Sequence, residues 1–185
     1  MVPIATPQNY DTNVDNLSKY GIEFQTKVLA SVISAPEFLE QSYDIINPYF
    51  FDSDSGKWIA KKTLSYYNEY RTLPTLEYFK IELAQESDDT LRAGTIELLR
   101  KVVTKVTDSD AEYIRDKFLD FARNQSLKSA IIKSVDLLQS GDYDKIKHVV
   151  DHALRATFSQ DELDSDREQD LLEQVTKHPI LFFDR

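Results

Sequence analysis

One stretch, residues 20–84, constrains the fold more than any other part of the chain. It contains four apolar segments with helical spacing, and short turns join them. Pro48 and Pro74 lie in two of these joints, and the residue before a proline disfavours the helical conformation, so each proline marks a helix boundary. The three adjacent aromatic residues 49–51 cannot share one helical face, and we expect them to form a corner that fills the core.

The composition is typical of a helical globular protein. Of the 185 residues, 41% are hydrophobic and 29% are charged, so the chain can build a packed core and global disorder is not expected. It has only four glycines, whereas sheet-rich folds with many tight turns usually need more. We therefore predict an all-α fold, in which a compact helical domain is followed by an antiparallel two-helix hairpin and an acidic linker.

The pattern along the chain predicts four regions. Residues 1–16 contain two prolines and no periodicity, and are interpreted as a flexible arm. Residues 17–107 form a globular helical domain, and 108–158 form a hairpin because a turn as short as the one at Gly141 should fold two helices back on each other. Residues 159–185 are interpreted as an acidic linker with a short helix. Their apolar end indicates either a missing partner surface or a chain cut from a longer one.

The first helix of the expected hairpin, over about residues 110–139, carries two apolar stripes. They are out of phase across residues 123–126, which indicates either a bend or two different neighbours. The first stripe consists of Ile114, Phe118 and Phe121, and the second of Leu127, Ile131, Val135 and Leu138. The second helix, over about residues 143–157, carries Ile146, Val149, Val150 and Leu154.

Residues 17–158 resemble the N-terminal domain of DnaB-like replicative helicases. The likeness rests on the order of the helices and the placement of the aromatic residues. Asn68 to Tyr70, followed by Leu73-Pro74, is most similar to the T4-like phage branch of that family. The matching parts are the helix over 24–33, the aromatic corner over 46–51, the helix over 57–71, the joint at 73–75 and the helical hairpin.

The resemblance implies a scaffold. In the family this domain forms the N-terminal collar of a hexameric ring, hairpins pair between subunits, and the collar receives primase or a helicase loader. We therefore expect self-association, as a dimer or a hexameric collar, in the cytoplasm of a bacterial or phage-infected cell. DNA would be reached only indirectly, through a motor. The alternative is a stand-alone phage adaptor that binds a replicative helicase and loads or inhibits it.

A two-helix hairpin has too little neighbouring surface to bury both of its apolar stripes alone. We predict that it packs against another copy, as the resemblance also implies. The interface candidates are Phe118, Phe121, Ile131, Val135, Leu138, Val149 and Val150.

The sequence does not predict an enzyme. The motor of the helicase family holds ATP with a Gly-x-x-x-x-Gly-Lys-Ser/Thr loop, whereas the only Gly-Lys pair here is Gly56-Lys57, which is followed by Trp58. The chain therefore cannot hydrolyse ATP by that mechanism. Its carboxylates lie along solvated faces and in the linker, so no general acid–base constellation stands out. We predict no catalytic residue, cofactor or metal.

The net charge of −10 would repel DNA, which disfavours direct nucleic-acid binding by the chain. The basic clusters are interpreted as ordinary solvated helix faces, with contact to DNA or primase as the alternative. A set of aromatic residues could stack on bases, but core or interface packing is favoured. The basic residues are Arg100, Lys101, Lys105, Lys128 and Lys133, and the aromatic ones are Trp58, Tyr66 and Tyr67.

Two histidines, His148 and His152, lie one helical turn apart, with Asp151 between them and Asp144 one turn earlier. This spacing can bind zinc and echoes an inverted zincin motif. Because no distant third ligand follows, the favoured interpretation is two histidines on the outer face of the hairpin.

The chain has no cysteine, no apolar run of the ~20 residues that a membrane span needs and no secretory signal, which fits a cytoplasmic location.

Overall fold

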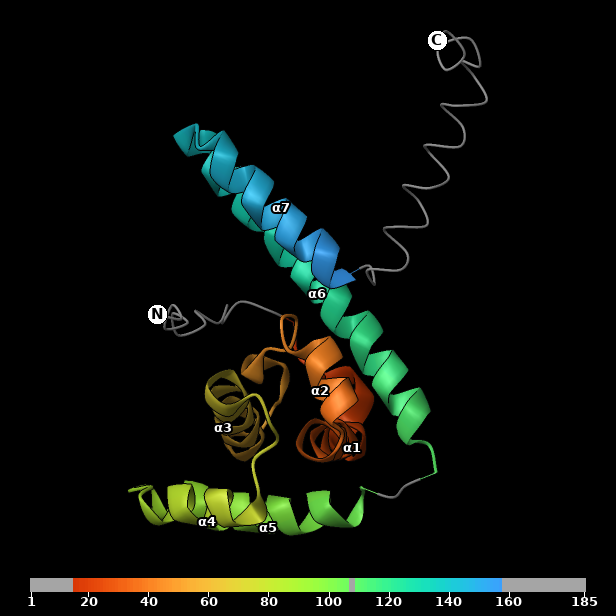
Figure 1. The fold of residues 1–185 in the computed structure, drawn as a ribbon, viewed down its shortest axis with the longest axis vertical. Helices are drawn as coiled ribbons and strands as arrows, with labels where there is room; N and C mark the ends of the chain where they lie inside the picture. Colours follow the sequence, from red (N-terminus) through yellow and green to blue (C-terminus); the bar gives the residue numbers. More distant parts are fainter. Residues whose placement is uncertain (1–14, 107–108, 158–185) are drawn as a thin grey trace, which may run out of the picture. The chain divides into compact units, whose positions relative to one another are not determined.

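The computed structural model describes residues 15–106 and 109–157. These residues form seven α-helices and two short 3-10 helices, and no β-strand, which confirms the all-α prediction (Figure 1). Residues up to Gln125 belong to one compact unit and residues from Ser126 onward to a second. Nearly all of the predicted arm, and the predicted linker with its apolar end, lie outside the described residues.

The first unit is built on two helices, α1 and α3, that pack against each other. Figure 1 shows both almost end on, with α5 crossing them; α5 contacts both, and α1 also contacts α2. None of the described helices has the length and apolar composition that a membrane span requires. The elements of this unit are η1 (Ser18–Tyr20), α1 (Gly21–Ser34), α2 (Pro36–Ser42), η2 (Pro48–Phe50), α3 (Asp54–Tyr70), α4 (Leu76–Ala84), α5 (Asp89–Thr104) and the first half of α6 (Ala111–Ser140).

Side-chain caps fix where α3 and α4 begin. The Ser53 hydroxyl accepts a hydrogen bond from the Gly56 amide at the start of α3, at 3.0 Å. Thr75 caps α4, because its hydroxyl accepts a hydrogen bond from the Tyr78 amide at 3.3 Å. These bonds satisfy amides that have no partner inside the helix.

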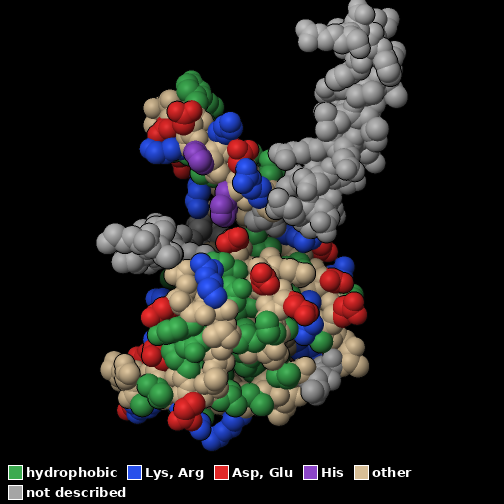
Figure 2. Space-filling view, in the orientation of Figure 1, with side chains coloured by type: hydrophobic (Ala, Val, Ile, Leu, Met, Phe, Trp, Pro, Cys, Tyr) green, Lys and Arg blue, Asp and Glu red, His purple; other side chains and the backbone are tan. Residues whose placement is uncertain are grey.

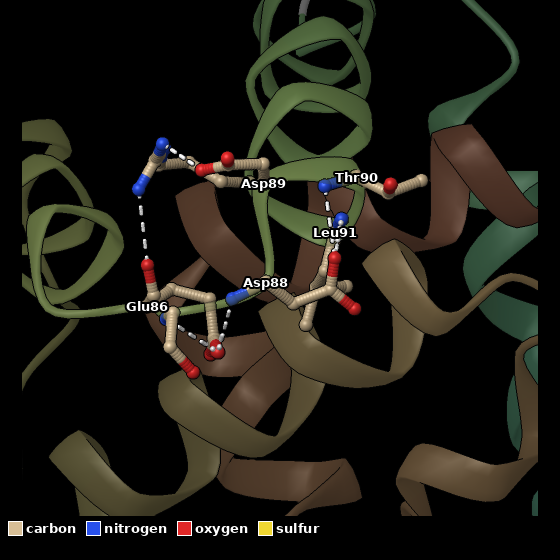
Figure 3. A network of polar contacts seen from close by, with 7 residues as sticks. Glu86, Asp88, Asp89, Thr90 and Leu91 are labelled. Carbon is tan, nitrogen blue, oxygen red and sulfur yellow. Dashed lines mark hydrogen bonds and ion pairs between the residues drawn. The ribbon is translucent and has the colours of Figure 1, made fainter.

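The joint between α4 and α5 is held by a polar network (Figure 3). The Asp88 carboxylate caps α5 by accepting from the amides of Thr90 and Leu91, at 2.8 and 3.0 Å. The Arg92 guanidinium donates to the Glu86 carbonyl at 3.1 Å and pairs with Asp89. These contacts connect the end of α4 to the first turn of α5.

The aromatic corner fills the core with two of its three rings. Phe50 and Phe51 are 2% and 1% exposed, whereas Tyr49 remains 41% exposed. The Phe50 carbonyl accepts from the Leu17 amide at 2.8 Å, which ties the corner to the start of the unit. Gly56 makes room for the corner, because a Cβ there would lie 3.1 Å from the Phe51 Cβ.

The first half of α6 completes the same core. Phe118 is fully buried and its ring lies 5.8 Å from that of Phe38. Phe121 is 4% exposed, and its ring contacts Phe50 at 5.0 Å. The division between the units therefore falls inside α6, after Gln125, and not after residue 107 as predicted, because these aromatic rings fill space that the preceding helices leave open.

Polar contacts also fasten this half of α6 to α1. Lys27 on α1 pairs with Asp110, just before α6, at 2.7 Å, and the hydrogen bond lowers the pKa of the Asp110 carboxyl. The Arg115 guanidinium donates to the Ser31 hydroxyl at 3.2 Å. The Asp15 amide donates to the side chain of Gln125 at 3.2 Å, so the end of the predicted arm is held against the helix.

The second unit is the hairpin formed by the rest of α6 and by α7 (Tyr143–Thr157). Figure 1 shows α7 lying beside the C-terminal part of α6. Gly141, with φ +72°, ends α6 in the left-handed conformation that glycine adopts most easily. The amides of Gly141 and Asp142 donate to the carbonyls of Leu138 and Leu137, each at 3.1 Å, which is the pattern of a Schellman cap.

Candidate interaction surface on the helical hairpin

The two helices of the hairpin meet along a thin seam. Its most buried side chains are small, because Ala130 on α6 is 4% exposed and Ala153 on α7 is 2% exposed. Alanines allow two helices to approach closely, but they bury little apolar area. The Ser134 hydroxyl, also in the seam, donates to the Ala130 carbonyl at 2.7 Å. The half-buried apolar side chains of the hairpin are Leu127, Leu137, Ile146, Val149, Val150 and Leu154.

Beside the seam lies a row of large aliphatic side chains that α7 does not cover, which we call the outer stripe. Its members are spaced so that they share one side of α6, one turn after another. Each is about half exposed or more, which is a high fraction for residues of this kind. The outer stripe consists of Ile131 at 58%, Ile132 at 48%, Val135 at 53% and Leu138 at 58% exposure.

The seven predicted interface residues fall into three groups. Ile131, Val135 and Leu138 lie in the outer stripe, where a second molecule could reach them. Val149 and Val150 are half buried in the hairpin. Phe118 and Phe121 are buried in the first unit, so their assignment to an exposed interface is corrected: the rings of Phe38, Phe50 and Tyr20 already contact them.

The sequence analysis missed two features of this surface. Ile132 belongs to the outer stripe because it lies three residues before Val135, but the prediction did not include it. Ala130 and Ala153 form the seam, yet alanine contributes too little hydrophobicity to stand out in a periodic pattern. The signal for Ala130 was its spacing from two half-buried leucines: Leu127 lies three residues before it and Leu137 seven residues after it, so all three share one face of α6.

The end of the hairpin is polar apart from one tyrosine. Tyr143 is 68% exposed at the start of α7. Asp142, which precedes it, pairs with Lys145 at 2.5 Å and accepts from the Lys145 amide at 3.3 Å. These hydrogen bonds lower the pKa of the Asp142 carboxyl, and its negative charge is favourable at a helix N-terminus.

The histidines of α7 do not belong to a metal centre in the part of the chain that the structure describes. His148, Asp151 and His152 are all exposed on the helix, as is Asp144. The described residues contain no group of three or more histidine, cysteine, aspartate or glutamate side chains that could hold a metal ion. This placement supports the interpretation of two histidines on a solvated helix face.

Two of the five basic residues pair with acidic ones. Lys101 pairs with Glu97 at 2.7 Å, and Lys105 pairs with Glu23 at 2.5 Å. Lys128 and Lys133 also have interaction partners. On the face seen in Figure 2, Lys and Arg side chains are interspersed with Asp and Glu. This arrangement favours solvated helix faces over a phosphate-binding surface.

The aromatic residues considered for base stacking are engaged within the first unit. Trp58 is 9% exposed and donates from its indole N–H to Glu86 at 3.1 Å. The Tyr66 ring lies 4.6 Å from the rings of both Tyr70 and Tyr78. Burial, with the nearby Glu82 carboxylate, raises the pKa of Tyr78 to about 12. Tyr67 packs against Tyr43, with 5.2 Å between ring centres.

Comparison with protein-family models, with curated proteins and with solved structures finds no match for this chain. The resemblance to the DnaB-like N-terminal domain therefore stays a prediction from the helix order and aromatic placement of the sequence. The surface that the geometry singles out is the outer stripe of the hairpin.

Proposed function

We propose that this chain is a non-enzymatic assembly domain, organised like the N-terminal domain of a DnaB-like helicase, that self-associates through the outer stripe. The observation that carries the proposal is the exposure of four large aliphatic side chains on one side of α6. Exposed apolar patches on otherwise polar helices mark sites of protein association. In this proposal the domain joins helicase subunits and presents a platform for primase or a loader.

The size of the outer stripe sets the strength of the expected association. Complete burial of an aliphatic side chain contributes about 1.5–3 kcal/mol, and these side chains are already about half buried, so each adds roughly 1 kcal/mol. In a two-fold pair both copies contribute, for a gross gain of roughly 8 kcal/mol. Association itself costs about 4–15 kcal/mol. The stripe therefore supports a weak dimer, and a stable ring requires further contacts or a tethered motor.

The test compares two variants that each add one positive charge to the hairpin. Val135→Lys places it within the outer stripe, and His148→Lys places it at an exposed position on α7. Self-association is measured by sedimentation velocity over a range of protein concentrations, and helix content by far-ultraviolet circular dichroism. We expect Val135→Lys to weaken association at least about tenfold, because an ammonium group would be buried without a partner.

His148→Lys is expected to associate like the wild-type chain, and both variants should keep their helix content. A wild-type chain that remains monomeric at every concentration would contradict the proposal. Equal association of Val135→Lys and the wild type would also contradict it, because the contact would then lie elsewhere.

A further inference from the structure

A groove of about 840 Å³ lies in the first unit between α2 with its following turn and the C-terminal end of α3. Two tyrosines form its aromatic part: the rings of Tyr43 and Tyr67 are 5.2 Å apart and inclined at 49°. The Tyr43 hydroxyl donates to the Asn68 side chain at 2.9 Å, which fixes that ring in place. Pro36, Thr72 and Leu73 also line the groove.

Arg71 stands over both rings, with its guanidinium carbon 5.8 Å from the centre of Tyr43 and 5.9 Å from that of Tyr67. It ends α3 with φ +53°, and among the described residues it is the only one other than glycine with a positive φ. Helices usually place glycine here because a side chain strains this conformation. An arginine in this strained conformation points to a use for its side chain.

The charged groups of the groove have no charged partner within the described part of the chain. Arg71 forms no hydrogen bond through its guanidinium and no ion pair there, and the carboxylates of Glu40 and Asp44 form no ion pair either. Since Glu40 and Asp44 come from the α2 side and Arg71 from the α3 side, the groove offers hydrogen-bond donors on one wall and acceptors on the other.

This combination selects among ligand classes. A nucleic acid or another polyanion is disfavoured because two carboxylates outweigh the one guanidinium. A purely apolar ligand would leave three charged groups without partners. An extended peptide in the polyproline II conformation fits better, because its prolines pack against aromatic rings and its backbone carbonyls have no internal partners. Arg71 can donate to those carbonyls, while Glu40 and Asp44 can pair with a basic side chain.

We propose that this groove binds an extended, proline-containing segment of a partner protein that carries a basic residue beside its prolines. The groove is on a different unit from the outer stripe, so this inference does not rest on the proposed self-association. Either one can fail while the other holds.

The probes are fluorescein-labelled synthetic peptides with a Pro-x-x-Pro core and an arginine at each flanking position in turn. Matched peptides carry glutamate in place of arginine, and a further peptide reproduces residues 1–12 of this chain, which contain two prolines and no basic residue. Binding to the full chain is measured by fluorescence anisotropy. We expect at least one arginine peptide to bind, and its glutamate counterpart to bind at least about tenfold more weakly.

Two groove variants and one control locate the binding. Arg71→Gly removes the guanidinium while suiting the positive φ, so the thermal midpoint should not fall and affinity should drop at least about tenfold. Asp44→Asn should produce a similar loss for arginine peptides only. Arg100→Ala, an exposed change on α5, should leave binding unchanged.

Three results would overturn the inference. One is that no arginine peptide binds. Another is that Arg71→Gly binds as tightly as the wild-type chain. The third is that the peptide of residues 1–12 binds more tightly than every arginine peptide, because the occupant would then be the chain's own N-terminal segment.

Discussion

The two units of this protein use the same helix in opposite ways. In the first unit α6 buries Phe118 completely among aromatic side chains from α2 and η2. In the second unit the same helix leaves Leu138 58% exposed beside a seam of alanines. Both side chains are large and apolar. The difference lies in the neighbours: several elements surround Phe118, whereas α7 can cover only one side of α6. Apolar character alone therefore does not determine burial; the number of elements packed around a position does.

The comparison predicts that truncating a side chain costs much more in the first unit. Phe118→Ala should lower the free energy of unfolding by about 3–5 kcal/mol, because it leaves a cavity in a packed core. Leu138→Ala should change the free energy by no more than about 0.5 kcal/mol, since much of that side chain already contacts solvent. Urea denaturation followed by circular dichroism measures both. Similar costs for the two variants would break the comparison.

The seam should be sensitive to added volume, not to lost volume. Ala153→Leu should destabilise the hairpin by about 1–3 kcal/mol, because the close approach of the helices leaves no space for a larger side chain. Hydrogen exchange should show faster exchange of the α7 amides and unchanged exchange in α1 and α3. The control is Ala93→Leu, at an exposed position on α5. An equal effect of both changes would show that the seam is loosely packed.

A smaller effect is expected from the joint between α4 and α5. Asp88→Ala removes the cap of α5 and should cost about 1 kcal/mol, whereas Asp88→Asn keeps a capping oxygen and should recover most of that loss. The measurement is the thermal unfolding midpoint of the three proteins. If Asp88→Asn is as unstable as Asp88→Ala, the carboxylate acts through its charge and not through the cap.

The smallest predicted effect depends on pH. Because the hydrogen bond from Lys27 lowers the pKa of Asp110 in the folded chain, the pair stabilises the fold above the carboxyl's unfolded pKa. That stability is lost as the pH falls through the lower, folded pKa. Asp110→Asn should therefore reduce the thermal midpoint slightly at neutral pH and have no effect in strong acid. Asp116→Asn, at an exposed position on α6, is the control; a pH-independent difference for Asp110→Asn would exclude the ion pair as its cause.

The sequence predicted the helices well because their ends carry local signals. Pro48, Pro74 and Gly141 mark ends or joints, and the expected helix over residues 57–71 is close to the observed α3, Asp54–Tyr70. These signals act within a few residues and do not depend on the rest of the fold. The same holds for the aromatic corner, where three adjacent rings could not all lie on one helix face.

The candidate surface was harder to predict because it depends on contacts distant in sequence. Periodicity predicts the stripe of Phe118 and Phe121 but does not say which residues cover it. The rings that cover it include those of Phe38 and Phe50, which lie far away along the chain. Likewise, the pattern on the second half of α6 could not show that α7 packs on the side of Ala130 and leaves Ile131 exposed. The change of phase across residues 123–126 predicts either a bend or two different neighbours, and the two halves of α6 do pack in different units.

The sharing of α6 determines where this chain can be divided. A fragment ending near residue 107 would keep every earlier helix and still lose the rings of Phe118 and Phe121, so its interior would be open to water. A fragment starting near residue 108 would carry those same rings with nothing to shelter them, and would tend to aggregate. A shortened version for crystallisation or labelling should therefore keep α6 together with the helices that precede it.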